Sequence, residues 1–516
     1  MGAGARQLAD LCSGIAEVPT SIRVTDVSLD SRTVAHGGLF LACAGRRTHG
    51  LAALPEALAR GARAVLWEPA TGISAPFAPA DVHLQAVDGL SMLASSIAGQ
   101  FFDQPSDTLR VAGITGTNGK TTSAWLLAQA LTRCAAKSAY MGTLGVGMVP
   151  DAVTPGEYTT ADAVSVQRQL AAMREAGAQC VAMEVSSHAL DQHRVAGVRF
   201  RVAAFTNLTR DHLDYHGTMD AYGAAKARLF DMPQLEAGVI NVDDAFGAEL
   251  ARRHASRLSL TLTARTAAGV SVIEDIRARV PQLRSLVGSD IRALPVGLSF
   301  AIESRNGMQD SVRRSATLPL IGEFNVENVL VTLGLLLELG IELESALDAL
   351  GDCGAPPGRM EATTAPGKAL AIVDYAHTPD ALAKSLRAAR AHCRGKLHLV
   401  FGCGGDRDTG KRPLMASVAA AMADAIVITD DNPRSESAAG IAADIIAGFP
   451  HGIRAAVIHD RAEAIRSALA SAREGDVVLV AGKGHENYQI VGAERRPFSD
   501  RDLIHSIYRT SDASAR

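Results

Sequence analysis

The segment from Gly113 to Thr122 reads G-I-T-G-T-N-G-K-T-T and constrains this chain more than any other stretch. Apolar residues from Leu109 to Ile114 favour a strand before it, and the apolar spacing from Trp125 to Ala135 favours an amphipathic helix after it. A strand, a glycine-rich turn and a helix N-terminus in this order cradle phosphate, because backbone N–H groups and the helix dipole attract anions. In such a cradle Lys120 reaches the β- and γ-phosphates and the Thr121 hydroxyl ligates Mg²⁺. The motif therefore predicts nucleotide binding without specifying a reaction.

The glycine spacing differs from the general phosphate-loop pattern, which has four residues between its first glycine and the Gly-Lys pair. Here five residues separate Gly113 from Gly119, and two separate Gly116 from Gly119. The alternative interpretation is a glycine-rich turn that exposes a lysine. The flanking strand and helix, together with the Lys-Thr-Thr ending, favour the phosphate site.

Length and composition indicate a globular protein of several domains. A chain of 516 residues exceeds one ordinary core, so we expect about three domains. The formal net charge is −4, so bulk electrostatics favours neither nucleic acid nor a membrane as a partner. Residues Met1 to Asp10 lack a basic segment followed by an apolar one, and no apolar run approaches the length of a membrane span. We therefore expect no signal peptide and no membrane insertion.

Seven cysteines are scattered along the chain without a C-x-x-C pair, which is typical of reduced thiols in a cytosol. Cys403 lies in the glycine-rich run F-G-C-G-G-D. It is either a reactive thiol or a small residue accommodated in a tight turn, and the second interpretation is favoured.

The pattern of strands and helices indicates an α/β protein with three domains. Residues 1–107 form the first domain, with a helix from Leu54 to Arg60 and a linker from Gln104 to Asp107. Residues 108–355 alternate between strands and helices, which predicts a mostly parallel sheet, although residues 261–315 are hard to interpret. A glycine- and proline-rich break precedes the third domain, residues 356–516, where alanine-rich helices separate apolar strands in a doubly wound, Rossmann-like pattern. Its strands are predicted at 370–373, 397–401, 425–429, 455–458 and 477–481.

Polar clusters follow several predicted strands, which is where α/β proteins place ligands. In the central domain Glu184 follows an apolar strand and is either a Mg²⁺ ligand or an ordinary helix N-terminal carboxylate. The loop from Thr206 to His216 is dense in acids and histidines and either binds metal or phosphate or is solvated. Lys226, on an alanine-rich helix, has no signal of its own.

Three further clusters follow strands of the C-terminal domain. They are Gly402 to Asp408, Asp430 to Arg434 and Gly482 to Glu486. Glycines expose N–H groups to anions, and arginines make forked bonds to carboxylates. Three such clusters in one domain predict a polar site of the size of a zwitterion.

Taken together, these residues resemble the Mur ligase family, the ATP-dependent amide-forming enzymes of peptidoglycan precursor synthesis. The resemblance covers nearly the whole chain, and the family's phosphate loop departs from the general pattern in the same way. The anchoring segments are residues 116–122, 184–188, 211–214, 322–328, 357–361 and 374–377. The fold that it implies is an N-terminal UDP-binding α/β domain, a central P-loop ATPase domain and a C-terminal amino-acid-binding domain.

The resemblance implies roles for the residues that handle ATP and metal. The expected ATP contacts are Gly116, Thr117, Asn118, Gly119, Lys120, Thr121, Thr122, Asn325, Asn328, Arg359 and Asp374. The expected ligands of two Mg²⁺ ions are Thr121, Glu184, His212 and Lys226, the last after carbamylation, and the catalytic residues are Lys120, Glu184, His212 and Lys226.

The resemblance also implies the sites of two further substrates. The UDP-muramoyl dipeptide is expected at the Gly45 to Gly50 loop and at Ser31, Thr159, Thr160, Ser186, Gln192 and Arg194. Members that add meso-diaminopimelate carry Asp-Asn-Pro-Arg where this chain has 431–434, and they bind the amino acid through Arg407, Asp431, Asn432, Arg434, Gly482 and Glu486. We expect a cytoplasmic monomer. Two alternatives are a folylpolyglutamate synthase, which shares the ATP machinery, and a nucleotide-dependent switch that does not ligate.

Overall fold

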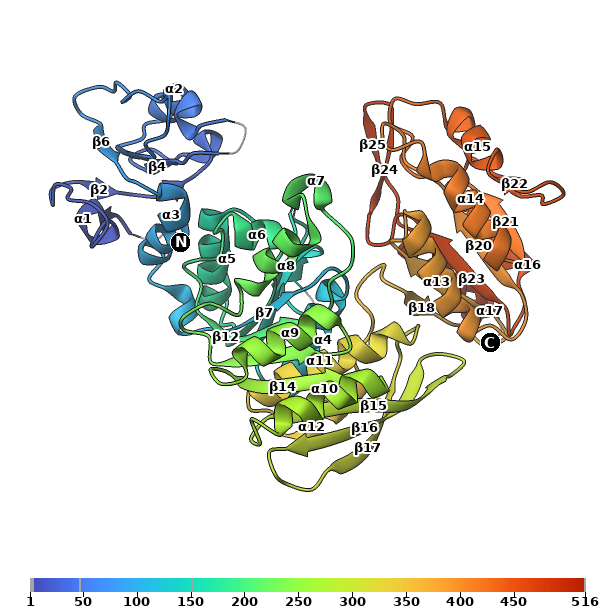
Figure 1. Ribbon diagram of the computed structural model, residues 1–516. Coiled ribbons are helices and arrows are strands. Elements are labelled where there is room, and N and C mark those ends of the chain that lie inside the picture. Colours follow the sequence, from blue (N-terminus) through green and yellow to red (C-terminus); the bar gives the residue numbers. More distant parts are fainter. Residues whose placement is uncertain (1–3, 46–47, 151, 157, 515–516) are drawn as a thin grey trace. The chain divides into compact units, whose positions relative to one another are not determined.

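The computed structural model describes residues 4–45, 48–150, 152–156 and 158–514. The chain divides into two compact units, one formed by Met1–Arg284 with Val331–Ala346 and the other by Ser285–Leu330 with Leu347–Arg516. Figure 1 shows the helices and strands, coloured along the sequence. The chain passes from one unit to the other at the start of β15 (Arg284–Ala293), within helix α11 (Phe324–Glu338) and within helix α12 (Leu343–Gly351). Arg46 and Arg47, in the predicted UDP loop, lie outside the described residues.

The N-terminal part of the first unit is a small parallel sheet in the order β3-β4-β5-β6. Its strands are Val27–Ser28, Leu39–Ala42, Ala64–Trp67 and His83–Ala86, and β1 (Arg6–Gln7) pairs separately with β2 (Arg23–Val24). The helices are α1 (Leu8–Leu11), η1 (Ser31–Thr33), η2 (Gly50–Ala53), α2 (Leu54–Ala59), α3 (Leu90–Phe101) and η3 (Pro105–Asp107). The predicted helix from Leu54 is thus confirmed.

The central strands of the first unit follow the order β10-β9-β8-β11-β7-β12-β13-β14. The pairs from β8 to β14 are parallel and only the edge strands β9 and β10 are antiparallel, so the mostly parallel sheet is confirmed. These strands are β7 (Arg110–Thr115), β8 (Ser138–Gly142), β9 (Gly145–Met148), β10 (Ala152–Thr154), β11 (Cys180–Glu184), β12 (Phe200–Phe205), β13 (Ala237–Asn241) and β14 (Ser259–Ala264). The helices between them are α4 (Lys120–Arg133), α5 (Ala163–Glu175), α6 (Ser187–Asp191), α7 (Leu213–His216), α8 (Met219–Ala227), α9 (Ala245–His254) and α10 (Ala267–Arg277).

The C-terminal sheet of the second unit has the order β18-β19-β23-β20-β21-β22 and is parallel except for β18. Its strands are Glu361–Thr363, Leu370–Asp374, Val477–Ala481, Leu397–Phe401, Ala425–Ile428 and Ala456–Val457 in that order. Helices α13 (Pro379–Ala391), α14 (Lys411–Met422), α15 (Ala438–Ile446), α16 (Arg461–Ser471) and α17 (Asp500–Ser514) accompany it, with a hairpin of β24 (Tyr488–Val491) and β25 (Glu494–Pro497). Two separate apolar clusters pack against the sheet, as continuous apolar strands require. The doubly wound prediction is confirmed.

Residues 261–315, for which the sequence predicts no clear pattern, include antiparallel strands. Strand β16 (Leu298–Asn306) pairs with β17 (Val312–Leu318), and β15 spans Arg284–Ala293. Domain boundaries at residues 107 and 355 stay a prediction. Among the described residues, none of the helices combines the length and the apolar character needed to cross a membrane.

Asp244 links a helix cap to the loop that follows β12. Its carboxylate accepts from the N–H groups of Phe246 and Gly247 at the start of α9 and from Leu208 N at 2.9 Å. We predict that Asp244→Ala lowers the free energy of unfolding by about 2 kcal/mol, since a cap is lost and the Leu208 N–H loses its partner. Urea denaturation tests this, with Thr218→Ala as control because, among the described residues, the Thr218 side chain accepts only from Ala221 N. Equal losses in the two variants would contradict the second role of Asp244.

Candidate active site

The phosphate loop turns tightly between β7 and α4. Lys120 begins α4, and its Nζ donates to the carbonyls of Gly116 and Thr117, each at 2.9 Å. Gly116 has φ +146°, and a Cβ there would lie 1.9 Å from Thr206 Oγ1, so no other residue fits without displacement. Thr117 N donates to Asn207 O at 2.7 Å and Asn118 N to Asn207 Oδ1 at 3.0 Å, which holds the loop in place. The predicted strand, glycine-rich turn and helix N-terminus are therefore present, and their binding of phosphate stays a prediction.

Glu184 and Lys226 converge on this loop from two other elements. Glu184, the fully buried end of β11, accepts from Thr121 Oγ1 at 2.9 Å, from Thr143 N at 2.9 Å and from the Tyr140 hydroxyl. Lys226 is 1% exposed, and its Nζ donates to Gly116 O at 2.8 Å. Burial, and then the charge of Lys120, lowers the pKa of Lys226 to about 6. Burial therefore favours the neutral form of this amine, which is the nucleophilic one.

His212 lies in a cluster of rings beside the same loop. It has φ +52° at the start of α7, is half exposed, and its ring centroid is 4.9 Å from that of His188. His188 is 5.4 Å from His216, whose Nε2 lies 3.0 Å from Ser187 Oγ. Burial, with the nearby His212 and His216 next, lowers the pKa of His188 to about 4, so His188 is a neutral neighbour for His212.

A cavity of about 1300 Å³ lies within the first unit. It is lined by the predicted dipeptide residues Thr159, Thr160, Gln192 and Arg194, and by Asp30, Arg32 and Gly45 from the N-terminal part. Arg194 donates to Thr160 O at 2.9 Å and to Gln192 Oε1 at 2.6 Å, so its guanidinium is fixed at the wall. Charged, amide and hydroxyl side chains thus line a cavity that is large enough for a large polar ligand.

Two of the predicted dipeptide residues are not among those that line this cavity. Ser31 is buried, and its hydroxyl donates to Glu56 Oε2 at 2.6 Å. Ser186 Oγ accepts from Ala189 N and caps α6. The neighbours Asp30 and Arg32 line the cavity in place of Ser31.

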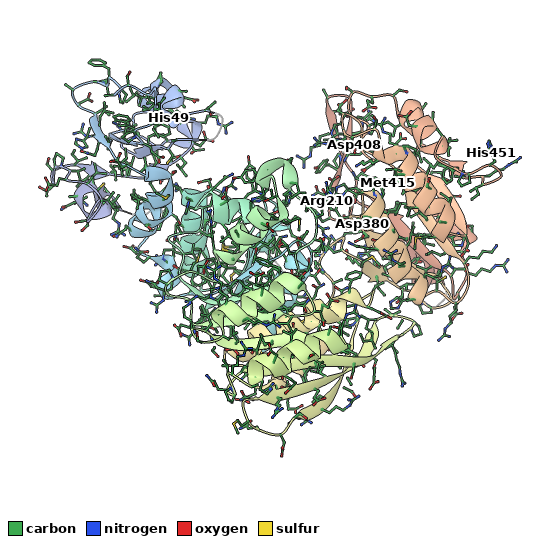
Figure 2. All side chains as sticks on the ribbon, viewed as in Figure 1. His49, Arg210, Asp380, Asp408, Met415 and His451 are labelled. Atoms are coloured by element: carbon green, nitrogen blue, oxygen red, sulfur yellow. The ribbon has the colours of Figure 1, made fainter. Side chains whose placement is uncertain are left out.

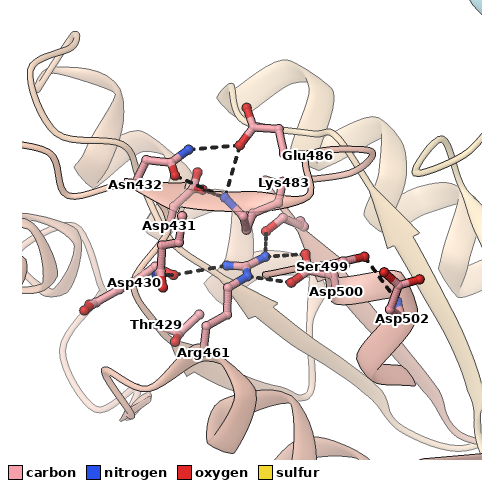
Figure 3. A network of polar contacts seen from close by, with 12 residues as sticks. Thr429, Asp430, Asp431, Asn432, Arg461, Lys483, Glu486, Ser499, Asp500 and Asp502 are labelled. Atoms are coloured by element: carbon pink, nitrogen blue, oxygen red, sulfur yellow. Dashed lines mark hydrogen bonds and ion pairs between the residues drawn. The ribbon is translucent and has the colours of Figure 1, made fainter. Parts of the chain in front are cut away.

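In the second unit, segments after β21 and β23 meet in a network of buried polar groups (Figure 3). Lys483 is fully buried, and its Nζ lies 3.4 Å from Asp431 Oδ1, 3.2 Å from Asn432 Oδ1 and 3.1 Å from Glu486 Oε2. Asn432 Nδ2 donates to Glu486 Oε2 at 2.9 Å. The structure thus brings together Asp431, Asn432 and Glu486, as predicted, through a lysine that the sequence did not single out.

Arg434 and Arg407 lie on the neighbouring loops. Arg434 has φ +52°, and its NH1 donates to Gly405 O at 2.7 Å, which orients the guanidinium. Arg407 is exposed on the loop after β20. Gly482 has φ +119°, and its Cβ position would lie 3.3 Å from Asp431 Oδ2, so the chain passes close to that carboxylate.

The predicted adenosine contacts of the second unit form two local groups. Asn328 Nδ2 donates to Asn325 Oδ1 at 2.8 Å, and Asn325 Nδ2 donates to Ile321 O at 2.9 Å. Asp374, at the end of β19, accepts from Met360 N and from Ser385 Oγ. The guanidinium of Arg359 stands 4.7 Å from the centre of the Tyr375 ring.

Cys403 is a packing residue and not a reactive thiol. Its Sγ is buried, 3.7 Å from Sδ of Met415, which Figure 2 labels within the C-terminal domain. Burial raises the pKa of this thiol to about 11.

Sequence reasoning missed Lys483, Arg461 and Tyr140. Lys483 had one signal, its position between two glycines after an apolar strand. Arg461 and Tyr140 had none, because a buried arginine at the start of a helix and a tyrosine in a strand look ordinary in sequence.

Comparison with known proteins places this arrangement in a family. Family models match in order along the chain: Mur ligase family, catalytic domain (residues 23–97), Mur ligase middle domain (114–336) and Mur ligase, glutamate ligase domain (358–484). The chain is 47% identical to UDP-N-acetylmuramoyl-L-alanyl-D-glutamate–2,6-diaminopimelate ligase of Ectopseudomonas mendocina, over 93% of this chain and 94% of the relative. The chain belongs to the Mur ligase family.

Two further Mur ligases support the assignment. The relative of the same name from Pseudomonas aeruginosa is 46% identical over 92% of this chain and 93% of its own. A solved structure of that name matches with a TM-score of 0.71 and 33% identity, over 98% of this chain and 99% of the other. The predicted three-domain α/β architecture is that of the Mur ligases.

The contribution of His485 to the free energy of unfolding is expected to depend on pH. Burial, and then the charges of Arg359 and Arg501, lowers the pKa of His485 from 6.5 to about 4. As pH falls from 6.5 to 4, the unfolded chain binds a proton there that the folded chain does not, so stability falls by at most ~1.4 kcal/mol per pH unit. We predict that His485→Phe removes this component, as measured by urea denaturation at pH 7 and pH 5.

The matched control for replacing an imidazole by a phenyl ring is His451→Phe, on the exposed loop before β22 (Figure 2). If His485→Phe and the wild type lose stability equally between pH 7 and pH 5, the interpretation of His485 is wrong.

Proposed function

We propose that this Mur ligase uses ATP to join meso-2,6-diaminopimelate to the D-glutamate γ-carboxylate of UDP-N-acetylmuramoyl-L-alanyl-D-glutamate. The observation that carries the proposal is the meeting of residues 431–434 with residues 482–486 in one buried polar network. The full-length relatives named for this reaction, at 46–47% identity, support it. The reaction is a step of peptidoglycan precursor synthesis.

The first half of the proposed reaction converts a poor acyl donor into a reactive one. A γ-carboxylate oxygen attacks the γ-phosphorus of ATP, and the acyl phosphate and ADP form. Lys120, at the loop carbonyls, would turn to the phosphate oxygens and offset the charge that opposes this approach of two anions. The cavity with Thr160, Gln192 and Arg194 would hold the muramoyl dipeptide.

The residues at the phosphate loop fit Mg²⁺. The Thr121 hydroxyl and Glu184 carboxylate are hard oxygen donors 2.9 Å apart. Lys226 fits carbamylation, because a buried amine with a pKa of about 6 can attack carbon dioxide and become a carboxylate-like donor. His212 would complete the proposed protein ligands for two ions. Bound Mg²⁺ would neutralise phosphate charge. Within the described residues no cluster of three His, Cys, Asp or Glu side chains forms a complete metal cage.

The second half of the proposed reaction requires an amine held in one orientation. Diaminopimelate carries a carboxylate and an ammonium at its distal end, and lysine carries only the ammonium. Arg434, whose plane is oriented by Gly405 O, suits the distal carboxylate, and Glu486 suits the ammonium. Buried groups left unpaired discriminate strongly against an analogue. The reacting amine then attacks the acyl carbon, and phosphate leaves.

A folylpolyglutamate synthase would accept glutamate and has no use for the network at 431–434 and 482–486. A nucleotide switch would hydrolyse ATP regardless of any amino acid. One experiment therefore distinguishes both alternatives from the proposed ligase.

We predict that phosphate release from ATP, Mg²⁺ and the UDP-muramoyl dipeptide requires meso-diaminopimelate. The assay compares this amino acid with L-lysine, L-glutamate and no amino acid, and identifies the tripeptide product by mass. Release with lysine would contradict the specificity argument. Release with glutamate would favour the synthase, and release independent of any amino acid would favour the switch.

We predict that Arg434→Leu lowers kcat/KM for diaminopimelate on the order of a thousandfold, because the distal carboxylate loses a forked partner. KM for ATP should stay nearly unchanged. The control is Arg495→Leu, an exposed arginine 3.8 Å from the centre of the Tyr488 ring on the adjacent hairpin. Equal effects of the two variants would exclude a specific role for Arg434.

A further inference from the structure

A fully buried ion pair lies next to the strand ends that carry the proposed amino-acid site (Figure 3). Arg461 begins α16 and Asp500 begins α17, and neither side chain is exposed. The contact is forked, with Arg461 Nε 2.7 Å from Asp500 Oδ1 and NH2 2.8 Å from Oδ2. The guanidinium is thereby held in one plane.

The other N–H groups of Arg461 reach the backbone of both site segments. NH2 donates to Ala481 O at 3.1 Å, and NH1 lies 3.5 Å from Asp430 O. Ala481 ends β23 and directly precedes Gly482, while Asp430 directly precedes Asp431. One guanidinium therefore contacts both segments of the proposed amino-acid site, in each case at the residue immediately before the segment begins its polar run.

The segment from Asp430 to Asn432 is also bonded to the neighbouring strand β24. Asp430 O also accepts from Gln489 Nε2 at 3.3 Å, and Asn432 Oδ1 accepts from Ile490 N at 2.9 Å. Lys483 Nζ then bridges Asn432 and Glu486. Arg461 thus acts on the backbone of the two segments, while Lys483 acts on their side chains.

Stability alone does not account for such a pair. Removing two charges from water is costly, and a well-packed apolar pair of similar size is often equally stable. An apolar pair cannot, however, donate to the carbonyls of Ala481 and Asp430. The distinctive contribution of Arg461 is therefore the fixed spacing of the two segments.

We propose that Arg461, oriented by Asp500, is a positioning residue that sets the distance between residues 430–434 and 482–486 and hence the affinity for the amino-acid substrate. The proposal rests on the proposed function, in which these segments bind diaminopimelate. Arg461 is not expected to touch the substrate, since its bonds run to Asp500 and to the backbone.

The main test replaces both partners, in Arg461→Met with Asp500→Leu, so that no unpaired charge stays buried. We expect a folded enzyme whose KM for diaminopimelate rises about tenfold to a hundredfold, as small misplacements of a binding group do. KM for ATP and for the UDP-muramoyl dipeptide should be nearly unchanged, and kcat should fall less than KM rises. A folded double variant with unchanged KM for diaminopimelate would overturn the proposal.

Arg461→Lys keeps the charge opposite Asp500 but has one nitrogen in place of the fork. It should raise KM for diaminopimelate by less than the double variant does. If the double variant does not fold, this variant decides, and an unchanged KM overturns the proposal.

The control for loss of an arginine–aspartate pair in the same domain is Arg390→Met. Arg390 bonds to Asp424 at 2.8 Å and to Met422 O at 2.9 Å, at the opposite edge of the sheet. Arg390→Met should lower stability without changing KM for diaminopimelate, and a rise in this KM equal to that of the double variant would overturn the proposal.

The wild type is assayed first. If it releases no phosphate in response to diaminopimelate, the proposed function fails, which is distinct from failure of the positioning role.

Discussion

The carboxyl ends of parallel strands lie along one edge of a sheet, and the proposed site of each unit depends on that constraint. In the first unit, β7 leads into the phosphate loop and β11 ends at Glu184. In the second, β21 and β23 lead into the segments that contain Asn432 and Glu486. Strands β7 and β11 pair directly, whereas β21 and β23 both pair with β20, which lies between them. In each case, residues far apart in sequence are brought to the same end of a parallel sheet.

Burial determines how the charged side chains at these sheet edges behave, because each of them needs a partner or loses its charge. Glu184 is buried but accepts bonds from Thr121 and Thr143, so its charge is compensated within the site. Lys226 has only a carbonyl and an aromatic ring as close partners among the contacts described, and its pKa falls. Lys483 and Arg461 keep carboxylate partners. The first kind of environment suits a reactive amine, and the second suits a rigid binding surface.

Sequence predicted the strands of the C-terminal domain well because strands buried on both faces are continuous apolar runs. The predicted ranges 397–401 and 477–481 match β20 and β23. Strand β17 escaped prediction since five of its seven residues are exposed and its partner is the antiparallel β16. Within the site, glycine-rich and acidic motifs could be found from sequence. Arg461 could not, because its partner Asp500 lies 39 residues away and nothing local indicates burial.

In the proposed reaction, ATP bound at the phosphate loop phosphorylates a substrate carboxylate and is not hydrolysed by water. The most direct measurement places a heavy oxygen isotope in the D-glutamate γ-carboxylate of the UDP-muramoyl dipeptide and analyses the released phosphate by mass. An acyl-phosphate route transfers one labelled oxygen to each phosphate formed with diaminopimelate present. Phosphate that carries no label, with the heavy oxygen retained in the dipeptide, would contradict acyl-phosphate formation.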